Sequence, residues 1–544
     1  MMLRPTNSLS LPEDTARIAH MAFPQGNLYL SLRDEFGELF DDGAFQDLFS
    51  RRGRPALPPW RLALITVVQF LEGVTDRQAA DQVRARIDLK YLLGLPLDDP
   101  GFHFSVLSEF RSRLIAGSAE GQLLDGLLSK FRDRGLIKRR GRQRTDSTHV
   151  LARVRSLTRL ESVGETLRAA LNAIATIQPT WLAWCPPEWF SRYGERLESA
   201  RLPKGQEEGH AYACQIGQDG CALLTQIDGT AHVQLGDLPA VQTLRRMWAL
   251  QFTQVDGDVR WQDGMVTNAR ERFNSPYDPE AGYGARGGLK WSGYKVHFTE
   301  SCEEDTPHVM TAVRTTEAAL TDYQVIDDIH QSLAERQLLP EEHLLDGGYI
   351  SGDLVVRAKE HHGVRVIGPA RQNASWQARS GGYDVTAFQI DWAKEQAVCP
   401  QGHTSYYWKN LREKRGYDLI EVRFRERDCQ KCPVKARCTR VKSAGRKLSL
   451  RGQAQHEAIQ EGRALETSVQ WGKVYTRRAG IEGTHSLGVR TMGLRRSRYR
   501  GQAKTHVQHV ATAAAINLMR VAAWLEHVPR QGTRISRFAA LKPQ

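Results

Sequence analysis

The sequence lacks a run of apolar residues long enough to cross a membrane. The best candidate, Ala511 to Leu525, contains Asn517 and Arg520 and is shorter than the roughly 20 residues that a spanning helix needs. The N-terminal residues have no apolar stretch of the kind that a signal peptide contains. Internal repeats and low-complexity tracts are also absent. We therefore expect a globular protein of the cytoplasm.

Acidic residues are scarce near the C-terminus. The segment from Trp471 to Gln544 contains 14 Lys and Arg but only two acids, Glu482 and Glu526, so it carries a net +12 of the chain's +13. A second acid-free group of cations precedes Asp146 and consists of Arg134, Lys138, Arg139, Arg140, Arg142 and Arg144. Such an excess indicates a polyanionic partner, as a phosphate backbone would be, although a solvated surface has the same composition.

Cysteine is rare, and half of the eight residues are gathered in one segment. The scattered ones are Cys185, Cys214, Cys221 and Cys302. Of the gathered ones, Cys429 and Cys432 have the spacing of a metal-binding knuckle, whereas Cys438 and the distant Cys399 are irregularly spaced. Four thiolates would form a closed structural zinc site. In a second possible ligand set, His403 replaces one of the cysteines. The alternative is a small lobe with reduced structural cysteines.

The chain of 544 residues is long enough for several domains, each with its own core. Strand-like runs at 143–153, 293–300, 308–315, 343–346 and 364–369 alternate with helical patterns, so we expect a mixed α/β core. The expected divisions are an N-terminal arm (1–50), a helical domain (51–140), a first core segment (141–374) with a helical insert (about 155–260), a cysteine-containing insert (375–470), a second core segment (471–525) and a basic tail (526–544).

Within the helical domain, Thr75 and Gln78 have the spacing of a capping box. One helix face is predicted behind it, from Ala79, Val83, Ile87 and Tyr91. A further helix over 104–114 should expose Arg111 and Arg113. Two helices with basic surface residues are typical of DNA-binding domains and equally of any small helical bundle, and the sequence does not separate these two interpretations.

Two aspartates lie at positions suited to metal-dependent phosphodiester chemistry. Asp146 lies in a strand-like run, and Asp346 ends the run HLLD before Gly347 and Gly348. Two-metal cleavage needs acids that hold the ions roughly 3.5–4 Å apart, and magnesium accepts two or three carboxylates together with water. For any single acid among the 62 in the chain, however, a surface salt bridge is the better interpretation.

Glu482 is the third candidate, in a helical segment. Tyr475, Arg478 and Glu482 fall at i, i+3 and i+7, which predicts one helix face with the arginine beside the glutamate. Gly480 and Gly483 flank the glutamate. Because glycine costs a helix about 1 kcal/mol, the pair indicates close approach of DNA or of another element.

Three segments, RQRTDSTHV, LLDGGYISGD and YTRRAGIEGTHSLGVRTMGLRRSRYRG, resemble the acidic motifs of bacterial insertion-sequence DDE transposases. The likeness is greatest to the IS-eleven-eighty-two type, in the group with a Y-x2-R-x3-E signature. Tyr475, Arg478 and Glu482 match that signature, and Asp346 with the small residues and Tyr349 after it matches the second motif. Together with an N-terminal stretch beginning FLEGVTDRQAAD, the resemblance covers residues of about 50–525.

The resemblance implies a ribonuclease-H-like catalytic core with two Mg²⁺ or Mn²⁺ ions on Asp146, Asp346 and Glu482. It implies DNA as partner, hydrolysis at transposon ends followed by attack of the freed 3′-hydroxyl, assembly as a homodimer or larger on DNA, and a place at the nucleoid. The group often has a lysine seven residues after the glutamate, where this chain has Val489, and Arg490 is the candidate substitute.

The predicted DNA contacts are Tyr475, Arg478, Arg490, Arg495, Arg496, Arg498, Arg500 and Lys504. Two other functions fit some features of the sequence. A catalytically inactive DNA-binding protein derived from a transposase would keep the fold, but the acids are intact at all three motifs. A zinc-dependent regulator would explain the cysteines but not the segment YTRRAGIEG.

Overall fold

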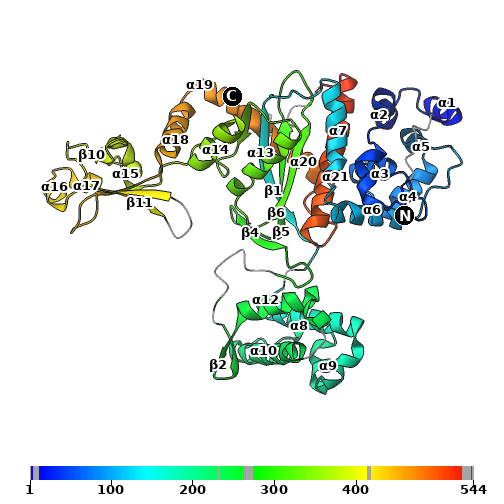
Figure 1. Cartoon of the computed structure of the whole chain (residues 1–544), viewed down its shortest axis with the longest axis horizontal. Helices are drawn as coiled ribbons and strands as arrows, with labels where there is room; N and C mark the ends of the chain where they lie inside the picture. The colour runs from blue at the N-terminus through cyan, green and yellow to red at the C-terminus, as the bar shows by residue number, and fades with distance from the viewer. Residues whose placement is uncertain are drawn as a thin grey trace.

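The computed structural model describes residues 2–3, 11–155, 157–229, 233–262, 264, 274–412, 418–529 and 541. Figure 1 shows a central sheet with helices around it, an N-terminal group of helices beside it, a helical lobe below and a smaller lobe at the far end. None of the helices in these ranges is both long and apolar enough to cross a membrane.

The central sheet is mixed and has six strands. They are β1 (Gln143–Leu151), β4 (Gly282–Arg286), β5 (Leu289–Ser301), β6 (Met310–Glu317), β7 (Glu342–Leu345) and β8 (Arg365–Ile367). The order is β4-β5-β1-β7-β8, and β6 also pairs with β5. Pairing is antiparallel from β5 to β1, β4 and β6, and parallel from β1 to β7 and from β7 to β8. The predicted mixed α/β core is confirmed at this level.

Helix α21 (Gln502–Leu525) is the central helix of the hydrophobic core. One continuous cluster of buried residues joins it to the sheet and to the N-terminal helices. The two polar residues that argued against a membrane span have partners inside the protein. Asn517 accepts from the backbone N–H of Met310 at 2.6 Å and donates to its carbonyl at 3.0 Å, and Arg520 pairs with Glu300 of β5.

The N-terminal helices are grouped beside α21. They are α1 (Glu13–Ala22), α2 (Leu28–Phe36), η1 (Asp42–Leu48), α3 (Pro59–Glu72), α4 (Asp76–Ala85), α5 (Ile87–Leu93), α6 (Ser105–Ala116) and α7 (Gln122–Asp133). Of these, α2, α3, α6 and α7 contact α21 directly. The capping box of Thr75 and Gln78 is confirmed. The single helix face through Tyr91 is wrong, because Arg86 is extended (φ −98°, ψ 125°) and ends α4.

Arg111 corrects a second expectation about these helices. It is only 7% exposed, and its guanidinium pairs with Asp76 at 2.5 Å instead of facing solvent. Arg113 is half-buried and donates to the Leu48 carbonyl at 3.1 Å. The basic surface that favoured DNA binding by α6 is therefore partly an internal ion pair.

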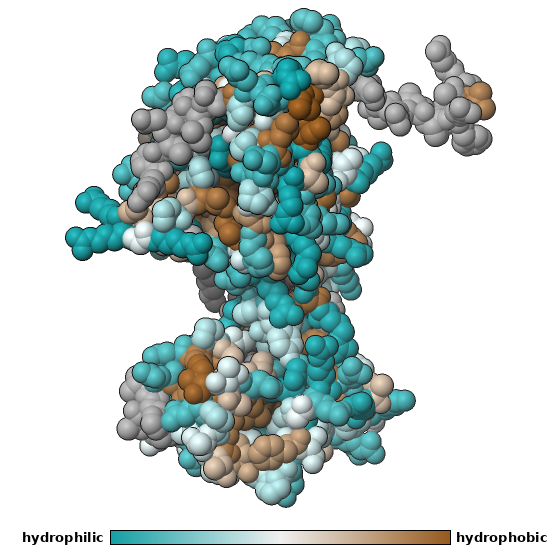
Figure 2. All heavy atoms as spheres, turned by 90° about the vertical axis from the view of Figure 1, so that its right-hand side faces the viewer, coloured by the Kyte–Doolittle hydropathy of each residue, from teal (hydrophilic) through white to brown (hydrophobic). Residues whose placement is uncertain are grey.

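The helical lobe is inserted between β1 and β4 and has its own core. Its elements are α8 (Arg159–Ile177), η2 (Pro179–Trp184), α9 (Pro187–Tyr193), η3 (Ser199–Arg201), α10 (Gln206–Asp228), α11 (Val233–Gly236), α12 (Pro239–Gln251), β2 (Phe252–Val255) and β3 (Asp258–Trp261). Trp189 is buried, with Trp181 and Trp184 partly buried against the same core. Figure 2 shows this lobe joined to the rest by a narrow waist.

A second insert lies between β8 and the C-terminal helices and contains the gathered cysteines; we call it the cysteine lobe. Its elements are α15 (Trp376–Arg379), η5 (Val385–Ala387), β9 (Gln389–Asp391), β10 (Gln396–Val398), β11 (Tyr407–Arg412), β12 (Asp418–Arg423), α16 (Glu426–Gln430), α17 (Lys435–Cys438) and β13 (Lys447–Leu450). The chain returns through α18 (Gln453–Glu466), which packs against α14 (Gly352–His362).

The remaining elements lie between β6 and β7 or after α18 in the sequence. They are η4 (Asp322–Gln324), α13 (Ile326–Glu335), α19 (Val469–Tyr475), η6 (Thr476–Ala479) and α20 (Gly480–Thr491). The predicted continuous helix through Tyr475 and Glu482 is interrupted, because residues 476–479 form a 3-10 turn between two α-helices.

Candidate catalytic site

The parallel pairing of β1 with β7 brings the two aspartates together. Thr145 is in register with Leu345, so Asp146 and Asp346 are the next residues on neighbouring strands. Adjacent strands lie about 4.8 Å apart. Two acids 200 positions apart in the sequence are therefore neighbours at one point of the sheet.

Arg478 joins the third acid to this place. Its Nη1 donates to Asp146 Oδ2 at 3.0 Å, and its Nη2 donates to Glu482 Oε1 at 2.8 Å. Although burial opposes the charged form, Asp146, Tyr475 and Asp346 raise the pKa of the Arg478 guanidinium. Arg478 thus bridges two of the three predicted carboxylates, Asp146 and Glu482, and its predicted contact with Glu482 is present despite the 3-10 turn.

Asp346 has a separate cation. Arg286, in the edge strand β4, donates to Asp346 Oδ2 at 3.1 Å, and the backbone N–H of Gly348 donates to Oδ1 at 2.5 Å. The glycine pair after Asp346 therefore turns a backbone amide onto the carboxylate. Sequence reasoning did not identify Arg286, since nothing in the run GYGAR indicates that its hairpin reaches another strand's end.

A fourth acid, Asp322, lies close to Asp146, because it contacts the adjacent Ser147. Its Oδ1 accepts from Lys295 Nζ at 2.8 Å, and its Oδ2 accepts from Ser147 Oγ at 3.2 Å. Burial, and then Asp322, raise the pKa of the buried Tyr349. Asp322 is in η4, outside the three motifs, so only the folded structure connects it with Asp146 through the adjacent serine.

Carboxylate oxygens are the ligands that magnesium prefers, so these acids suit a divalent cation in their chemistry. Across the described portion of the chain, however, no three or more His, Cys, Asp or Glu side chains are arranged to hold a metal ion. Arg478 lies between Asp146 and Glu482, and Arg286 holds Asp346. Metal binding here requires that at least Arg478 leaves its two carboxylates.

A buried ion-pair network around Glu300 connects the elements that carry the candidate catalytic residues. Glu300 of β5 is fully buried and pairs with Arg144 at 2.5 Å and Arg520 at 2.7 Å, and Thr484 Oγ1 donates to it at 2.7 Å. Burial opposes ionisation of Glu300, yet the two arginines lower its pKa to about 2. Because Arg144 precedes Asp146 by two residues, the network connects β1 to α20 and α21.

Arg144 also explains one of the two glycines beside Glu482. Its guanidinium donates to the carbonyl of Arg477 and occupies the space where a Cβ on Gly480 would lie. Nothing lies within 4 Å of the corresponding position on Gly483. The predicted close approach is thus made at Gly480 by a side chain of the protein itself.

The cations that follow Glu482 divide into two groups. Arg495 donates to Thr148 Oγ1 at 2.8 Å, and Arg498 donates to the Val74 carbonyl at 2.9 Å; burial lowers the pKa of both. The exposed group comprises Arg490, Arg496, Arg500 and Lys504. At the position of the family's lysine, Val489 packs against the core.

The second basic cluster, before Asp146, is mostly engaged in internal contacts. Its ion pairs are Arg134 with Glu35, Lys138 with Asp305, Arg142 with Glu342 and Arg144 with Glu300. Arg140 donates to the carbonyls of His362 and Gly363. These cations hold neighbouring elements together, so they form a poorer phosphate track than the exposed residues after Glu482.

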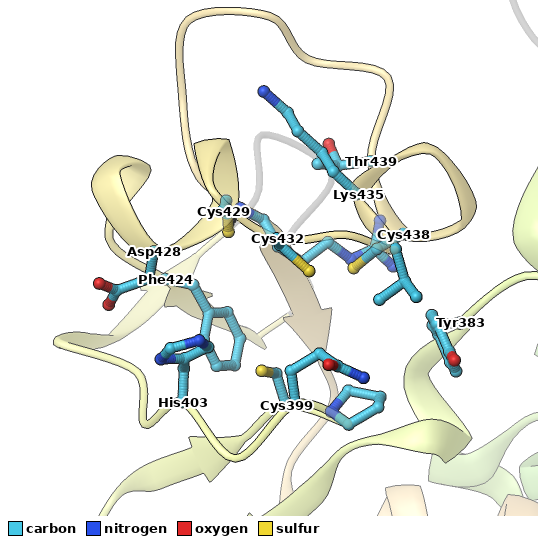
Figure 3. Close-up of a pocket in the computed structure, with 14 residues that line it drawn as sticks. Tyr383, Cys399, His403, Phe424, Asp428, Cys429, Cys432, Lys435, Cys438 and Thr439 are labelled. Atoms are coloured by element: carbon cyan, nitrogen blue, oxygen red, sulfur yellow. Dashed lines mark hydrogen bonds between the residues drawn. The ribbon is translucent and has the colours of Figure 1, made fainter.

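The four gathered cysteines lie together although their spacing is irregular. Cys399, Cys429, Cys432 and Cys438 line one cavity of the cysteine lobe, as Figure 3 shows. Burial raises the pKa of the Cys438 thiol, the other three thiols raise it further, and Arg446 acts against them. The long gap after Cys399 is therefore closed by the fold of the lobe.

Two segments of the chain match known protein families. Residues 19–113 match the family described as "Transposase domain (DUF772)", and residues 398–522 match "Transposase DDE domain". The second match contains Glu482 and all four gathered cysteines, whereas Asp146 and Asp346 lie outside both. A search of curated proteins found no match. The two family matches support an insertion-sequence transposase.

Proposed function

We propose that the protein is a DDE transposase that cleaves DNA at the ends of an insertion sequence and transfers the freed strand to target DNA. Asp146, Asp346 and Glu482 would be its catalytic carboxylates and would hold two Mg²⁺ or Mn²⁺ ions. The observation that supports the proposal is the position of Asp146 and Asp346 on the parallel pair β1 and β7, with Arg478 linking Asp146 to Glu482.

A ribonuclease-H-like core belongs to this proposal. Its support is the mixed sheet, in which Asp146 lies on β1 between an antiparallel and a parallel neighbour. The two transposase family matches support the same function from segments on either side of β1 and β7 in the sequence. Action as a homodimer or larger assembly on DNA, at the nucleoid, remains a prediction.

The residues of this chain would bind and orient the ions and the DNA. When bound, a pair of divalent cations activates water and neutralises charge on the scissile phosphate. Arg478 balances Asp146 and Glu482 in their absence and, once released, is placed to contact a DNA phosphate. Glu300 and Arg144 keep β1 and α20 at a fixed separation, and therefore keep Asp146 near Glu482.

Strand cleavage is the direct test of the function. Wild-type protein should nick DNA that carries the element's ends in Mg²⁺ and not in chelator. Asp146→Asn, Asp346→Asn and Glu482→Gln should each abolish nicking while binding in a gel-shift assay persists, because the changes keep shape and remove the charge that holds the ions. A variant with near wild-type nicking would exclude that residue as a ligand.

The same assay separates the alternative function. A DNA-binding protein that has lost catalysis would bind the ends and never nick them in Mg²⁺ or Mn²⁺, whichever carboxylate is present. Asp322→Asn is a useful comparison, because this acid contacts Ser147 beside Asp146 but is already paired with Lys295. We expect it to retain nicking above the level of the three carboxylate variants.

A further inference from the structure

The cysteine lobe has little hydrophobic core of its own. Its buried apolar residues are Phe388, Ala397, Val422, Phe424, Leu448 and Leu450. Helices α16 and α17, which contain Cys429 and Cys438, have five and four residues and no buried side chain. Small units with so little buried surface usually need a disulfide or a metal ion for stability.

The cysteines come from two loops that face each other across the cavity. In the first, the backbone N–H of Gly402 donates to the Cys399 carbonyl at 2.8 Å, and Gly402 has the φ of +80° that such a tight turn requires. In the second, Cys432 N–H donates to the Cys429 carbonyl at 3.3 Å, and α17 ends at Cys438. Figure 3 shows the four sulfur atoms around a common space.

Two groups beside the cysteines would stabilise thiolates held by a metal ion. The backbone N–H of Arg446 donates to Cys429 Sγ at 3.3 Å, and such hydrogen bonds stabilise a thiolate. The Arg446 guanidinium lies in the lining of the same cavity, and its Nε has no hydrogen-bond partner among the described residues. A half-buried cation beside four thiols offsets some of the negative charge that a four-thiolate centre would have.

His403 differs from the cysteines in its placement. It is exposed, whereas all four cysteines are half-buried. Its carbonyl accepts from the Cys399 N–H at 2.9 Å, so its backbone already has a role in shaping the first loop. The cavity has room for about 30 Å³, which suits a single small ion.

We propose that Cys399, Cys429, Cys432 and Cys438 bind one zinc ion as a closed, structural four-thiolate site, without His403. The four thiols lie around one space, but among the described residues they are not yet arranged closely enough to bind a metal ion. Tetrahedral Zn–S bonds of about 2.3 Å therefore require the two loops to close slightly. The ion would stabilise the cysteine lobe, whose hydrophobic core is small. This proposal is independent of the proposed transposase chemistry.

Metal content of the full-length protein, purified reduced and without chelator, tests the site. We expect about one zinc per chain by elemental analysis. Zinc should be lost in Cys429→Ser/Cys432→Ser and kept in His403→Ala and in Cys214→Ser, a control at a scattered cysteine. Retention of zinc in the double variant, or its loss in His403→Ala, would overturn the assignment of ligands.

Two measurements on wild-type protein avoid variants that fail to fold. A mercurial reagent should release the zinc as four thiols react, as a chelating dye would report. Replacement of zinc by Co²⁺ should give the absorption of tetrahedral cobalt with sulfur-to-metal charge transfer, unchanged in His403→Ala. Reduced wild-type protein that contains no zinc and takes up neither metal would refute the proposal, whether or not the protein nicks DNA.

Discussion

Replacing Glu300 with glutamine should destabilise the protein strongly, because it leaves the buried Arg144 and the partly buried Arg520 without their shared anion. A carboxyl whose pKa falls from 4.5 to about 2 on folding is stabilised in its charged form by about 3 kcal/mol. Independently, removing one member of a buried ion pair typically costs about 3–5 kcal/mol. At about 2 °C per kcal/mol for a large domain, Tm should fall by roughly 6–10 °C at pH 7.

The pH dependence gives the sign of the effect. Because folding lowers the pKa of Glu300, its contribution is complete above the unfolded value near 4.5 and is lost as pH falls toward about 2. The Tm difference between wild type and Glu300→Gln should therefore shrink over that interval. Calorimetry between pH 2 and pH 7 measures it, under conditions in which both proteins unfold reversibly.

Glu304→Gln is the matched control, since this nearby acid is 79% exposed in its 2.7 Å pair with Arg477. A surface pair of this kind contributes about 0–1 kcal/mol, so Tm should change by about 1 °C or less. Equal Tm values for wild type and Glu300→Gln at pH 7, or an equal loss in both variants, would refute the view that the buried network supports the site.

Three further experiments with substituted proteins test separate regions of the structure. Arg478→Ala should bind Mn²⁺ about tenfold more tightly, since a competing cation is removed, yet should nick DNA more slowly; weaker Mn²⁺ binding in a titration would contradict this. Arg490→Ala/Arg496→Ala should lower the log–log salt slope of DNA binding by about two, at about 0.9 per phosphate, and an unchanged slope would place the DNA elsewhere. Gly480→Ala should cost about 1–3 kcal/mol in thermal unfolding because the methyl group meets a guanidinium, whereas Gly483→Ala has open space and should be neutral or stabilising.

The two aspartates were predictable because strand-like runs are local features of the sequence. HLLD before two glycines indicated the end of a short strand, and Asp146 lay within the strand-like run 143–153, so the two aspartates needed only parallel pairing of these strands to meet. Glu482 and Arg478 were linked by helical spacing, which survives the 3-10 turn between them. Periodicity gave these positions without any knowledge of the packing.

The partners of the charged residues were not predictable, since they depend on contacts far apart in the sequence. Arg111 was expected at the surface but pairs with Asp76 inside the helical bundle. Arg144 belonged to an apparent phosphate track, yet it is buried against Glu300, 156 residues away. Composition counts charges, and only the fold decides which of them are neutralised within the protein.

The irregular cysteine spacing shows the same limit. Sequence spacing identified Cys429 and Cys432 as a pair and grouped Cys438 and Cys399 with them, but the irregular intervals did not show how the four could meet. The fold of the lobe brings the turn after β10 against α16 and α17, and so places all four thiols at one cavity.

Anomalous diffraction at the manganese edge, from crystals of the protein bound to DNA ends in Mn²⁺, tests the central claim most directly. We predict manganese peaks bound to the carboxylates of Asp146, Asp346 and Glu482, with the Arg478 guanidinium moved away from Asp146. A complex that cleaves DNA in the crystal while these carboxylates bind no manganese and Arg478 keeps its 3.0 Å contact with Asp146 would contradict the proposed catalytic site.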